Sequence, residues 1–335
     1  MKCKKLLSVL LTLSLALALT ACGAEKTPAA GSDSAEAEPE TYRVAALKGP
    51  TAMGLAYLAD DGGKGATGTN TYELTLAASA DEVTPLLVKG ELDMACVPAN
   101  LAAVLSNKTA GQIVTLAINT LGVLYIVEKG NAVQSVADLA GKTIVASGKG
   151  STPEYALRYL LSENGLDPDE DVTVDWKSEH SECVAALASG AATVALLPQP
   201  FVTVAQGKVE DLRMALDLTE EWDALNNGSA LLTGVVVARR DVVEENPAAV
   251  ENFLRDYAAS VDAVNGDTAA AAERIGEMGI VDAAVAEKAL PYCNIVCITG
   301  AEMQSKLSGY LQVLYDANAA SVGGALPEAD FYFGA

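Results

Sequence analysis

Short apolar segments alternate with amphipathic segments from about Tyr42 to the end of the chain. Three early segments have the length and apolar content of buried strands: TYRVAALK (41–48), TYELTLAA (71–78) and LDMACV (92–97). Helical patterns follow the first two, over 51–60 and 80–91. This alternation predicts an α/β fold built on parallel sheets.

The same pattern restarts after residue 140, with further strand-like segments in KTIVAS (142–147), VTVDWKS (172–178) and TVALLP (193–198). No repeat of fixed period accompanies the restart, so it indicates two α/β units. The chain is expected to cross between these units near 120–128 and near 230–236. The predicted organisation is lobe 1 over 42–122, lobe 2 over 123–234, and a mainly helical return to lobe 1 over 235–335.

A ligand cleft is expected between the two lobes, because open α/β sheets bind ligands at the carboxyl ends of their strands. Turns after predicted strands, together with the two crossings, supply the candidate ligand-binding residues: Gly49, Pro50, Thr51, Pro98, Asn100, Asn119, Thr120, Gly150, Ser151, Thr152, Gln199 and Thr233. Several of these have an equally good structural explanation. Asn100 and Thr51 suit a helix N-cap, and Asn119 and Thr120 suit the backbone of the crossing.

A glycine-rich turn, ASGKGSTPEY (146–155), leads into a predicted helix. It lacks the glycine spacing of a P-loop and the third glycine of a dinucleotide-binding turn. Ser151 and Glu154 fit a capping box at the start of a helix. The alternative is that Ser151 and Thr152 donate to a ligand oxyanion, in which case Glu154 would instead favour a cationic group.

The first 41 residues are not expected to belong to the fold. Three lysines and an apolar run to Leu19 form a signal peptide over 1–21, too short to span a bilayer comfortably. Cys22 follows Leu19-Thr20-Ala21, as in a bacterial lipobox, so its thiol is the expected site of a diacylglycerol with acyl chains such as palmitate. Residues 22–41 are small, polar and acidic, which predicts a flexible tether. The protein is therefore expected on the outer face of a membrane, held by the lipid.

The charge balance excludes one class of partner. Without the signal peptide, 19 basic side chains face 44 acidic ones, a net charge of −25. A chain this acidic is a poor nucleic-acid binder, although its charge does not exclude an anionic small ligand.

Few residues suit metal binding or catalysis. His180 is the only histidine, so neither a His-rich metal site nor a His-paired nucleophile is expected. The cluster around it, Lys177 to Glu182, also reads as a helix start with Ser178 as N-cap. Cys293 and Cys297 are read as two buried thiols, with a disulfide as the alternative.

The segments ALKGPTAMGLA, VPANLAAVL, DLAGKTIVASGKGSTPEYAL and LLPQPFVTVAQ, in this order and behind a lipobox, resemble the lipoprotein substrate-binding components of bacterial ABC importers. Within that group they are similar to the nitrate, taurine, alkanesulfonate and thiamine-precursor branch, and the likeness covers most of residues 42–335. The resemblance implies a two-lobed type II periplasmic-binding-protein fold without cofactor or metal, acting as a monomer. It also implies capture of a solute by lobe closure and delivery to a permease with ATPase subunits.

The sequence leaves the solute open between a sulfonate, a nitrate-like anion and a pyrimidine-type heterocycle. Two rival functions also remain: a sensor or partner-binding lipoprotein that feeds no transporter, and an enzyme on the same fold that uses Glu154 or His180.

Overall fold

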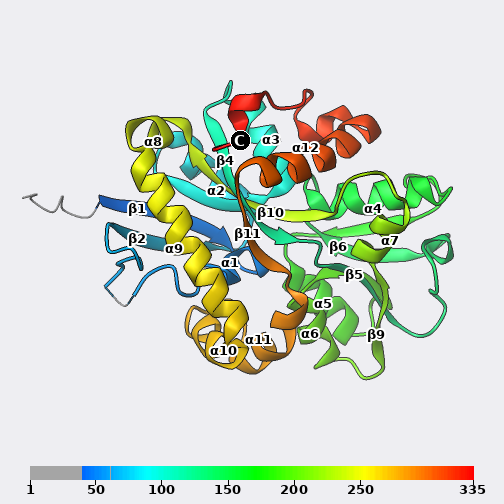
Figure 1. Cartoon of the computed structure of the whole chain (residues 1–335). Coiled ribbons are helices and arrows are strands. Elements are labelled where there is room, and N and C mark those ends of the chain that lie inside the picture. Colours follow the sequence, from blue (N-terminus) through cyan, green and yellow to red (C-terminus); the bar gives the residue numbers. More distant parts are fainter. Residues whose placement is uncertain (1–39, 61) are drawn as a thin grey trace, which may run out of the picture. The chain divides into compact units, whose positions relative to one another are not determined.

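The computed structural model describes residues 40–60 and 62–335, which belong to one compact unit (Figure 1). The signal peptide, Cys22 and nearly all of the tether lie outside the described residues. Two β-sheets organise the unit. Sheet A has the strand order β11-β4-β10-β3-β1-β2. Its strands are β1 (Glu40–Leu47), β2 (Asn70–Ala77), β3 (Met94–Pro98), β4 (Ile113–Leu121), β10 (Leu232–Arg239) and β11 (Ile295–Ile298).

Sheet B has the order β7-β6-β8-β5-β9. Its strands are β5 (Leu124–Lys129), β6 (Thr143–Ser147), β7 (Thr173–Lys177), β8 (Val194–Pro198) and β9 (Leu212–Asp217). The two sheets share a plan: three neighbouring strands are parallel in each, β2-β1-β3 in sheet A and β7-β6-β8 in sheet B. The repeated pattern in the sequence corresponds to this repeated plan.

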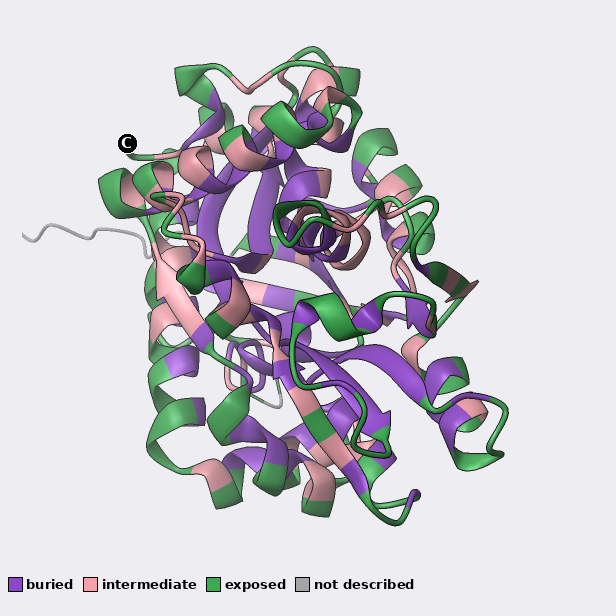
Figure 2. Ribbon diagram, turned by 90° about the vertical axis from the view of Figure 1, so that its right-hand side faces the viewer, coloured by how far each residue is buried: buried purple, intermediate pink, exposed green. Residues whose placement is uncertain are grey.

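Helices cover the sheets, with exposed residues on their outer sides and buried strands between them (Figure 2). The α-helices are α1 (Pro50–Met53), α2 (Ala80–Lys89), α3 (Ala99–Lys108), α4 (Thr152–Glu163), α5 (His180–Ala188), α6 (Phe201–Gln206), α7 (Leu218–Ala224), α8 (Arg240–Glu245), α9 (Pro247–Gly266), α10 (Thr268–Glu277), α11 (Ala283–Ala289) and α12 (Gly300–Ala317). Short 3₁₀ turns are η1 (Val136–Leu139), η2 (Leu290–Tyr292), η3 (Ala319–Val322) and η4 (Ala329–Phe331).

The predicted α/β fold is confirmed, but its sheets are mixed, because one strand beside each crossing runs against the parallel strands. β10 is antiparallel to both β3 and β4, and β5 is antiparallel to both β8 and β9. Each of these strands is the first in its sheet after a crossing: β5 follows β4 after two residues, and β10 follows β9 after α7. Each therefore starts at the edge where the parallel strands end, and must run against them.

The chain leaves sheet A at Leu121 and starts sheet B at Leu124, with Gly122 in the connection. The Asn294 side chain donates to the Gly122 carbonyl at 2.6 Å. A Cβ on Gly122 would lie 2.1 Å from Thr219 Oγ1, at the start of α7. The return strand β10 joins sheet A from Leu232 onward, two residues before the expected end of lobe 2.

The helix predicted over 51–60 is wrong beyond its first turn, since α1 ends at Met53. Ser260 of α9 accepts from the Tyr57 N–H at 2.9 Å and donates to the Gly54 carbonyl at 2.7 Å. Arg274 of α10 donates to the carbonyls of Ala56 and Ala59. Side chains from distant helices thus take the backbone groups that a longer α1 would have paired internally.

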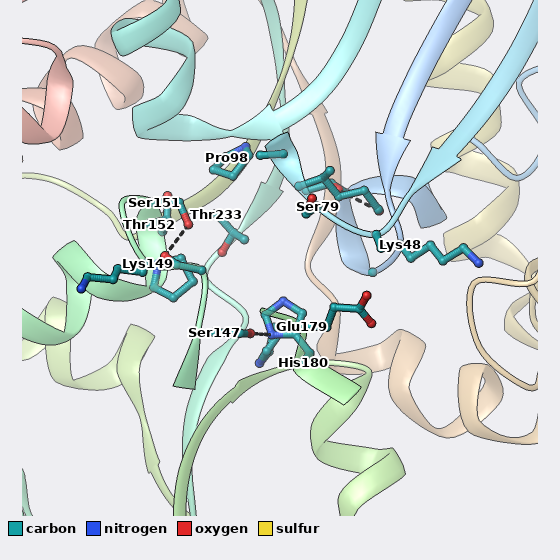
Figure 3. A pocket seen from close by; sticks show the side chains of 18 of the residues that line it. Lys48, Ser79, Pro98, Ser147, Lys149, Ser151, Thr152, Glu179, His180 and Thr233 are labelled. Carbon is teal, nitrogen blue, oxygen red and sulfur yellow. Dashed lines mark hydrogen bonds between the residues drawn. The ribbon is translucent and has the colours of Figure 1, made fainter. Parts of the chain in front are cut away.

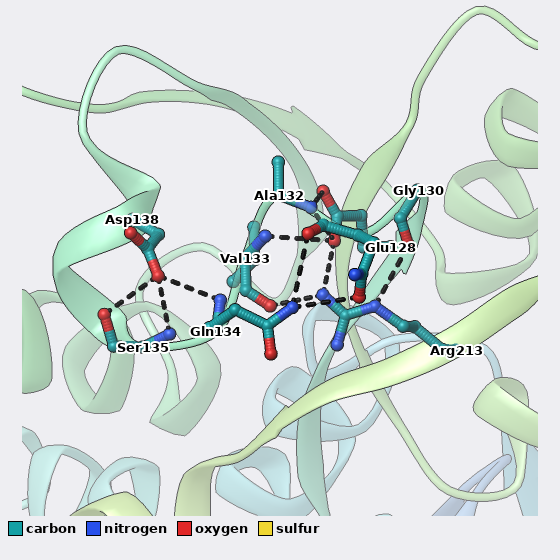
Figure 4. A network of polar contacts seen from close by, with 9 residues as sticks. Glu128, Gly130, Ala132, Val133, Gln134, Ser135, Asp138 and Arg213 are labelled. Atoms are coloured by element: carbon teal, nitrogen blue, oxygen red, sulfur yellow. Dashed lines mark hydrogen bonds and ion pairs between the residues drawn. The ribbon is translucent and has the colours of Figure 1, made fainter.

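A buried ion pair fixes the turn after β5 in sheet B (Figure 4). Glu128 accepts from the N–H groups of Ala132 and Val133 and from the Arg213 guanidinium on β9. Arg213 also donates to the carbonyls of Gly130 and Val133. The turn is therefore held from both sides by one carboxylate and one guanidinium.

The four cysteines of the described region are free thiols: Cys96, Cys183 and Cys293 are buried, and Cys297 is half-buried. The thiol of Cys293 donates to the Ala289 carbonyl at 3.2 Å.

Candidate functional site

A cavity of about 420 Å³ lies between sheets A and B, where their parallel strands end (Figure 3). The carboxyl ends of all six parallel strands contribute lining residues. These are Leu47, Ser79, Pro98, Ser147, Lys177 and Pro198, each at or within two residues of a strand end. This is the position that the α/β topology predicts for a ligand site.

The side formed by sheet A consists of the turns after β1, β2 and β3. Gly49 has φ 148°, a conformation that glycine adopts most readily, and it leads into Pro50 and Thr51. Ser79 is the N-cap of α2, and its side chain makes no capping bond to the helix backbone. The Ser79 hydroxyl donates to the Glu82 carboxylate at 3.3 Å, and the Glu82 N–H donates to the Ser79 carbonyl. The N–H groups that precede Glu82 in α2 have no acceptor within the helix, so this edge offers donors to the cavity.

The opposite side is the glycine-rich turn between β6 and α4. Gly148 and Gly150 both have positive φ, and the Ser151 hydroxyl donates to the Gly148 carbonyl at 2.7 Å. The Glu154 carboxylate accepts from the Gly150 N–H at 2.6 Å. Glu154 thus folds back on its own turn, although it bonds to the residue before the N-cap rather than to Ser151 itself. The turn is held in shape by its own side chains.

Ser147 and His180 meet at the floor of the cavity. Ser147 ends β6, His180 begins α5, and Ser147 Oγ lies 2.5 Å from His180 Nδ1. The Phe201 ring packs against the imidazole with a centroid separation of 4.9 Å. Burial lowers the pKa of His180 to about 4, so the ring is neutral at pH 7. The N-cap of α5 is Glu179 rather than the predicted Ser178.

Thr233 at the start of β10 lies in the cavity wall, beside the second crossing. Its hydroxyl oxygen is buried and has no hydrogen-bond partner among the described residues. A buried hydroxyl without a partner costs roughly 1–3 kcal/mol. A ligand atom that hydrogen-bonds the Thr233 hydroxyl would remove this cost.

Eight of the twelve predicted ligand-binding residues line this cavity: Gly49, Pro50, Thr51, Pro98, Gly150, Ser151, Thr152 and Thr233. The other four are buried beside it, namely Asn100, Asn119, Thr120 and Gln199.

Each of these four side chains is engaged within the protein. Asn100 donates to the Ser321 carbonyl at 2.9 Å. Asn119 donates to the Thr51 carbonyl at 3.4 Å and accepts from the Thr120 hydroxyl at 3.0 Å. Gln199 accepts from the Thr203 hydroxyl at 2.9 Å. In this state they support the walls and do not face the cavity.

The sequence did not single out several lining residues as ligand contacts: Lys48, Ser79, Asp81, Ser147, Lys149, Glu179 and His180. Ser79 follows a predicted strand and Ser147 ends one, so the positions next to Thr51 and Ser151 in the pattern already pointed to them. The nearness of His180 to Ser147 has no local signal, since 33 residues separate them in the chain.

Comparison with known proteins identifies the family. A family model described as "ABC transporter, phosphonate, periplasmic substrate-binding protein" matches residues 64–287, well over half of the chain. The chain belongs to this family. It is thus the solute-binding component of an ABC import system, and it acts outside the cytoplasm. No curated protein matches the sequence.

Solved structures confirm the two-lobed type II periplasmic-binding-protein fold. An ABC transporter protein from Parabacteroides distasonis superposes with a TM-score of 0.70 at 24% identity, covering 87% of this chain and 98% of that one. The alkanesulfonate-binding protein SsuA from Xanthomonas axonopodis pv. citri, bound to MOPS, gives 0.67 at 18% identity, with 88% and 97% covered. The nitrate-binding protein NrtA from Synechocystis PCC 6803 gives 0.56 at 17% identity, with 71% and 66% covered.

The predicted membership among ABC importer binding proteins is therefore confirmed. The matching model is that of the phosphonate family, while the similar structures include alkanesulfonate- and nitrate-binding proteins. Among the described residues, no helix is long and apolar enough to cross a membrane.

Proposed function

We propose that the cavity binds a small solute with an oxyanion head group and that the two lobes close around it. Hydroxyl groups line the cavity from both lobes: Ser79, Thr51 and Thr233 from sheet A, and Ser147, Ser151 and Thr152 from sheet B. In this state all of them except Thr233 hydrogen-bond within the protein, so a ligand would have to take over their donors. The N-termini of α2, α4 and α5 open onto the same space. Hydroxyl groups and helix N-termini are the donors that proteins use for phosphate-like and sulfonate-like groups. The phosphonate named for the family, and the sulfonate and nitrate named for similar structures, fit this donor set.

The unpartnered hydroxyl of Thr233 is the observation that carries this proposal. It lies in the cavity wall at the crossing between the lobes, so closure of either lobe would bring a bound ligand towards it. A ligand oxygen at this position would satisfy the hydroxyl. The closed, loaded state would then gain a hydrogen bond that the empty state lacks, which is what couples binding to closure.

An anion is favoured over a flat heterocycle because none of the residues lining the cavity is Phe, Tyr or Trp. Trp222 is fully buried and packs in tilted ring contacts with Tyr159 and Tyr310. Phe201 packs behind His180. These rings are engaged elsewhere and do not form a stacking slot.

We further propose that the protein is a binding protein without catalytic activity. The Ser147–His180 pair looks like part of a nucleophilic site. However, no carboxylate among the described residues hydrogen-bonds the imidazole to orient it as a base. The binding-protein family of the chain supports the same conclusion.

Two variants test the anion site. Thr233→Val removes the hydroxyl in the cavity. Thr115→Val removes another buried hydroxyl without a partner, on β4 outside the cavity. Because each hydroxyl is unpartnered, both variants are expected to match or exceed the stability of the unchanged protein. Only Thr233→Val is expected to weaken binding, by about 10- to 100-fold, which corresponds to a lost hydrogen bond to a charged group.

The measurement is calorimetric titration of residues 23–335 with methylphosphonate, ethanesulfonate and nitrate, with small-angle scattering to detect contraction on binding. Tight binding that Thr233→Val leaves unchanged would remove Thr233 from the site. Failure of every oxyanion to bind, while a neutral heterocycle binds, would overturn the proposed ligand class.

A further inference from the structure

The proposed anion site has a shortage of positive charge. Of the three lysines that line the cavity, the side chains of Lys48 and Lys149 extend away from its centre (Figure 3). The ammonium of Lys177 is paired with Asp175 at 2.9 Å. Asp81 and Glu179 also line the cavity and would repel an anion. No arginine is among the lining residues.

One cavity residue can become a cation without moving. The His180 ring lies in the cavity floor, half-buried, with Nδ1 held by Ser147 and its face against Phe201. Protonation makes both ring nitrogens donors. Nδ1–H would then donate to Ser147 Oγ, whose hydroxyl is free to rotate, and Nε2–H would be available to a ligand. The start of α5 already fixes the ring in place, so little reorganisation is needed.

Several charged and titratable groups lie near the His180 ring. Its own helix carries Glu182 and Cys183, with Glu179 at the N-cap, and the end of β7 carries the paired Asp175 and Lys177. The elements packed against it contribute Ser147 from β6 and Phe201 from α6, neither of which titrates in this range. Across the cavity lie Asp81, Lys48 and Lys149.

Resting on the proposed function, we propose that the site takes up its anion together with one proton, which binds to His180. In the empty protein burial opposes the imidazolium, and its pKa is lowered to about 4. A bound anion within hydrogen-bonding distance stabilises the imidazolium, and closure removes the water that would screen this attraction. Such a charge typically raises the pKa of a neighbouring group by about 1–3 units.

The sign of the pH dependence follows from linkage. Since the pKa is higher in the loaded state, the loaded state binds more protons, and affinity increases as the pH falls. The gain approaches tenfold per pH unit between the pKa of the loaded state and that of the empty state. The site therefore favours an anion whose own charge does not change over this range, such as a sulfonate or a singly charged phosphonate.

The experiment is an NMR titration of the untagged protein, residues 23–335. His180 is the only histidine of the chain, so its ring C2–H signal reports one pKa without assignment. The pKa is measured without ligand and with saturating ethanesulfonate, which remains ionised throughout. The expected result is an upward shift of one unit or more. Calorimetric affinity for ethanesulfonate should strengthen from pH 7 to pH 5, and His180→Gln should remove this dependence while its thermal midpoint shows that it remains folded.

Ethanesulfonate that binds without shifting the His180 pKa would overturn proton uptake and leave the anion site standing. A pH dependence that persists in His180→Gln would assign it to another group and would also overturn the inference. If neither ethanesulfonate nor methylphosphonate binds, the proposed function fails, and the inference fails with it. If only methylphosphonate binds, a His180 pKa that it raises by one unit or more supports the inference, and an unchanged His180 pKa overturns it.

Discussion

At the scale of single residues, the pair of Glu128 and Arg213 shows how a buried carboxylate can remain ionised. The Glu128 side chain is 5% exposed, and its carboxylate accepts from two backbone N–H groups as well as from the guanidinium. Burial raises the pKa of Glu128, but the Val133 N–H, Arg213 and the Ala132 N–H outweigh it and bring the pKa below its usual value. The carboxylate is therefore ionised in the folded state because its partners are already in place.

Removing Arg213 from this pair should lower the stability of the folded protein. Arg213→Ala leaves the buried carboxylate with its backbone donors alone, and we expect a loss of about 2–4 kcal/mol in the free energy of unfolding. Arg158→Ala is the matched control. Arg158 pairs with Asp169, whose side chain is 71% exposed, so its loss should cost less than about 1 kcal/mol. Urea unfolding of both variants measures the difference, and equal costs would contradict the argument from burial.

The pH dependence of the same pair has a definite sign. Because the folded-state pKa of Glu128 is depressed, its contribution to stability is present above the usual carboxyl pKa and is lost as the pH falls through the folded value. Glu128→Gln should flatten this acid limb of the stability curve. If stability falls just as steeply with decreasing pH in Glu128→Gln, the loss at low pH comes from other carboxylates.

Residue-level prediction named cavity-lining residues where local chemistry decides, and named residues behind the cavity walls where distant contacts decide. The turns at Gly49–Thr51 and Gly150–Thr152 could be named because glycine, proline and hydroxyl residues directly follow predicted strands. Asn100 follows a predicted strand equally well, yet its amide is taken by the carbonyl of Ser321, 221 residues away. Nothing near Asn100 in the sequence indicates that contact.

At the scale of elements, the parallel strands were the predictable part of the fold. Each is a short apolar segment followed by a helical pattern, which is the strongest signal of an α/β unit. The edge strands β9 and β11 were not predicted: IVCI has only four residues, and LRMALD carries an arginine and an aspartate within six residues. The direction of β10 depends on where the chain enters the sheet, which hydrophobic periodicity does not encode.

The contact between the first crossing and α7 yields a prediction at this scale. Gly122→Ala would place its Cβ 2.1 Å from Thr219 Oγ1, so α7 or the crossing must shift. We expect a loss of about 1–3 kcal/mol, the usual cost of overpacking. Thr219→Ala in the same chain should restore part of it, because the overlapping oxygen is then gone. Thermal unfolding of the single and double variants measures this, and additive losses would show that the two residues are not coupled.

At the scale of the whole molecule, the fold places the cavity within one compact unit, and the predicted attachment site lies outside the described residues. The compact unit that holds the cavity is supported by hundreds of residues of sheet and helix. The predicted lipid site, Cys22, lies outside the described residues and about twenty positions before β1. We propose that a lipid on Cys22 keeps this receptor at the membrane and that the polar segment up to residue 41 lets it reach its permease.

Anchoring and binding should then be separable. Cys22→Ser in the full chain is expected to move the protein from the membrane fraction to the soluble fraction, because a signal peptide alone leaves no membrane anchor once it is removed. Its affinity for ethanesulfonate or methylphosphonate should be unchanged, since the cavity draws on residues from Leu47 onward. Fractionation of cells that express each form, with mass spectrometry of the mature N-terminus, measures the first effect, and calorimetry measures the second. Membrane retention of Cys22→Ser would show that attachment depends on another part of the chain.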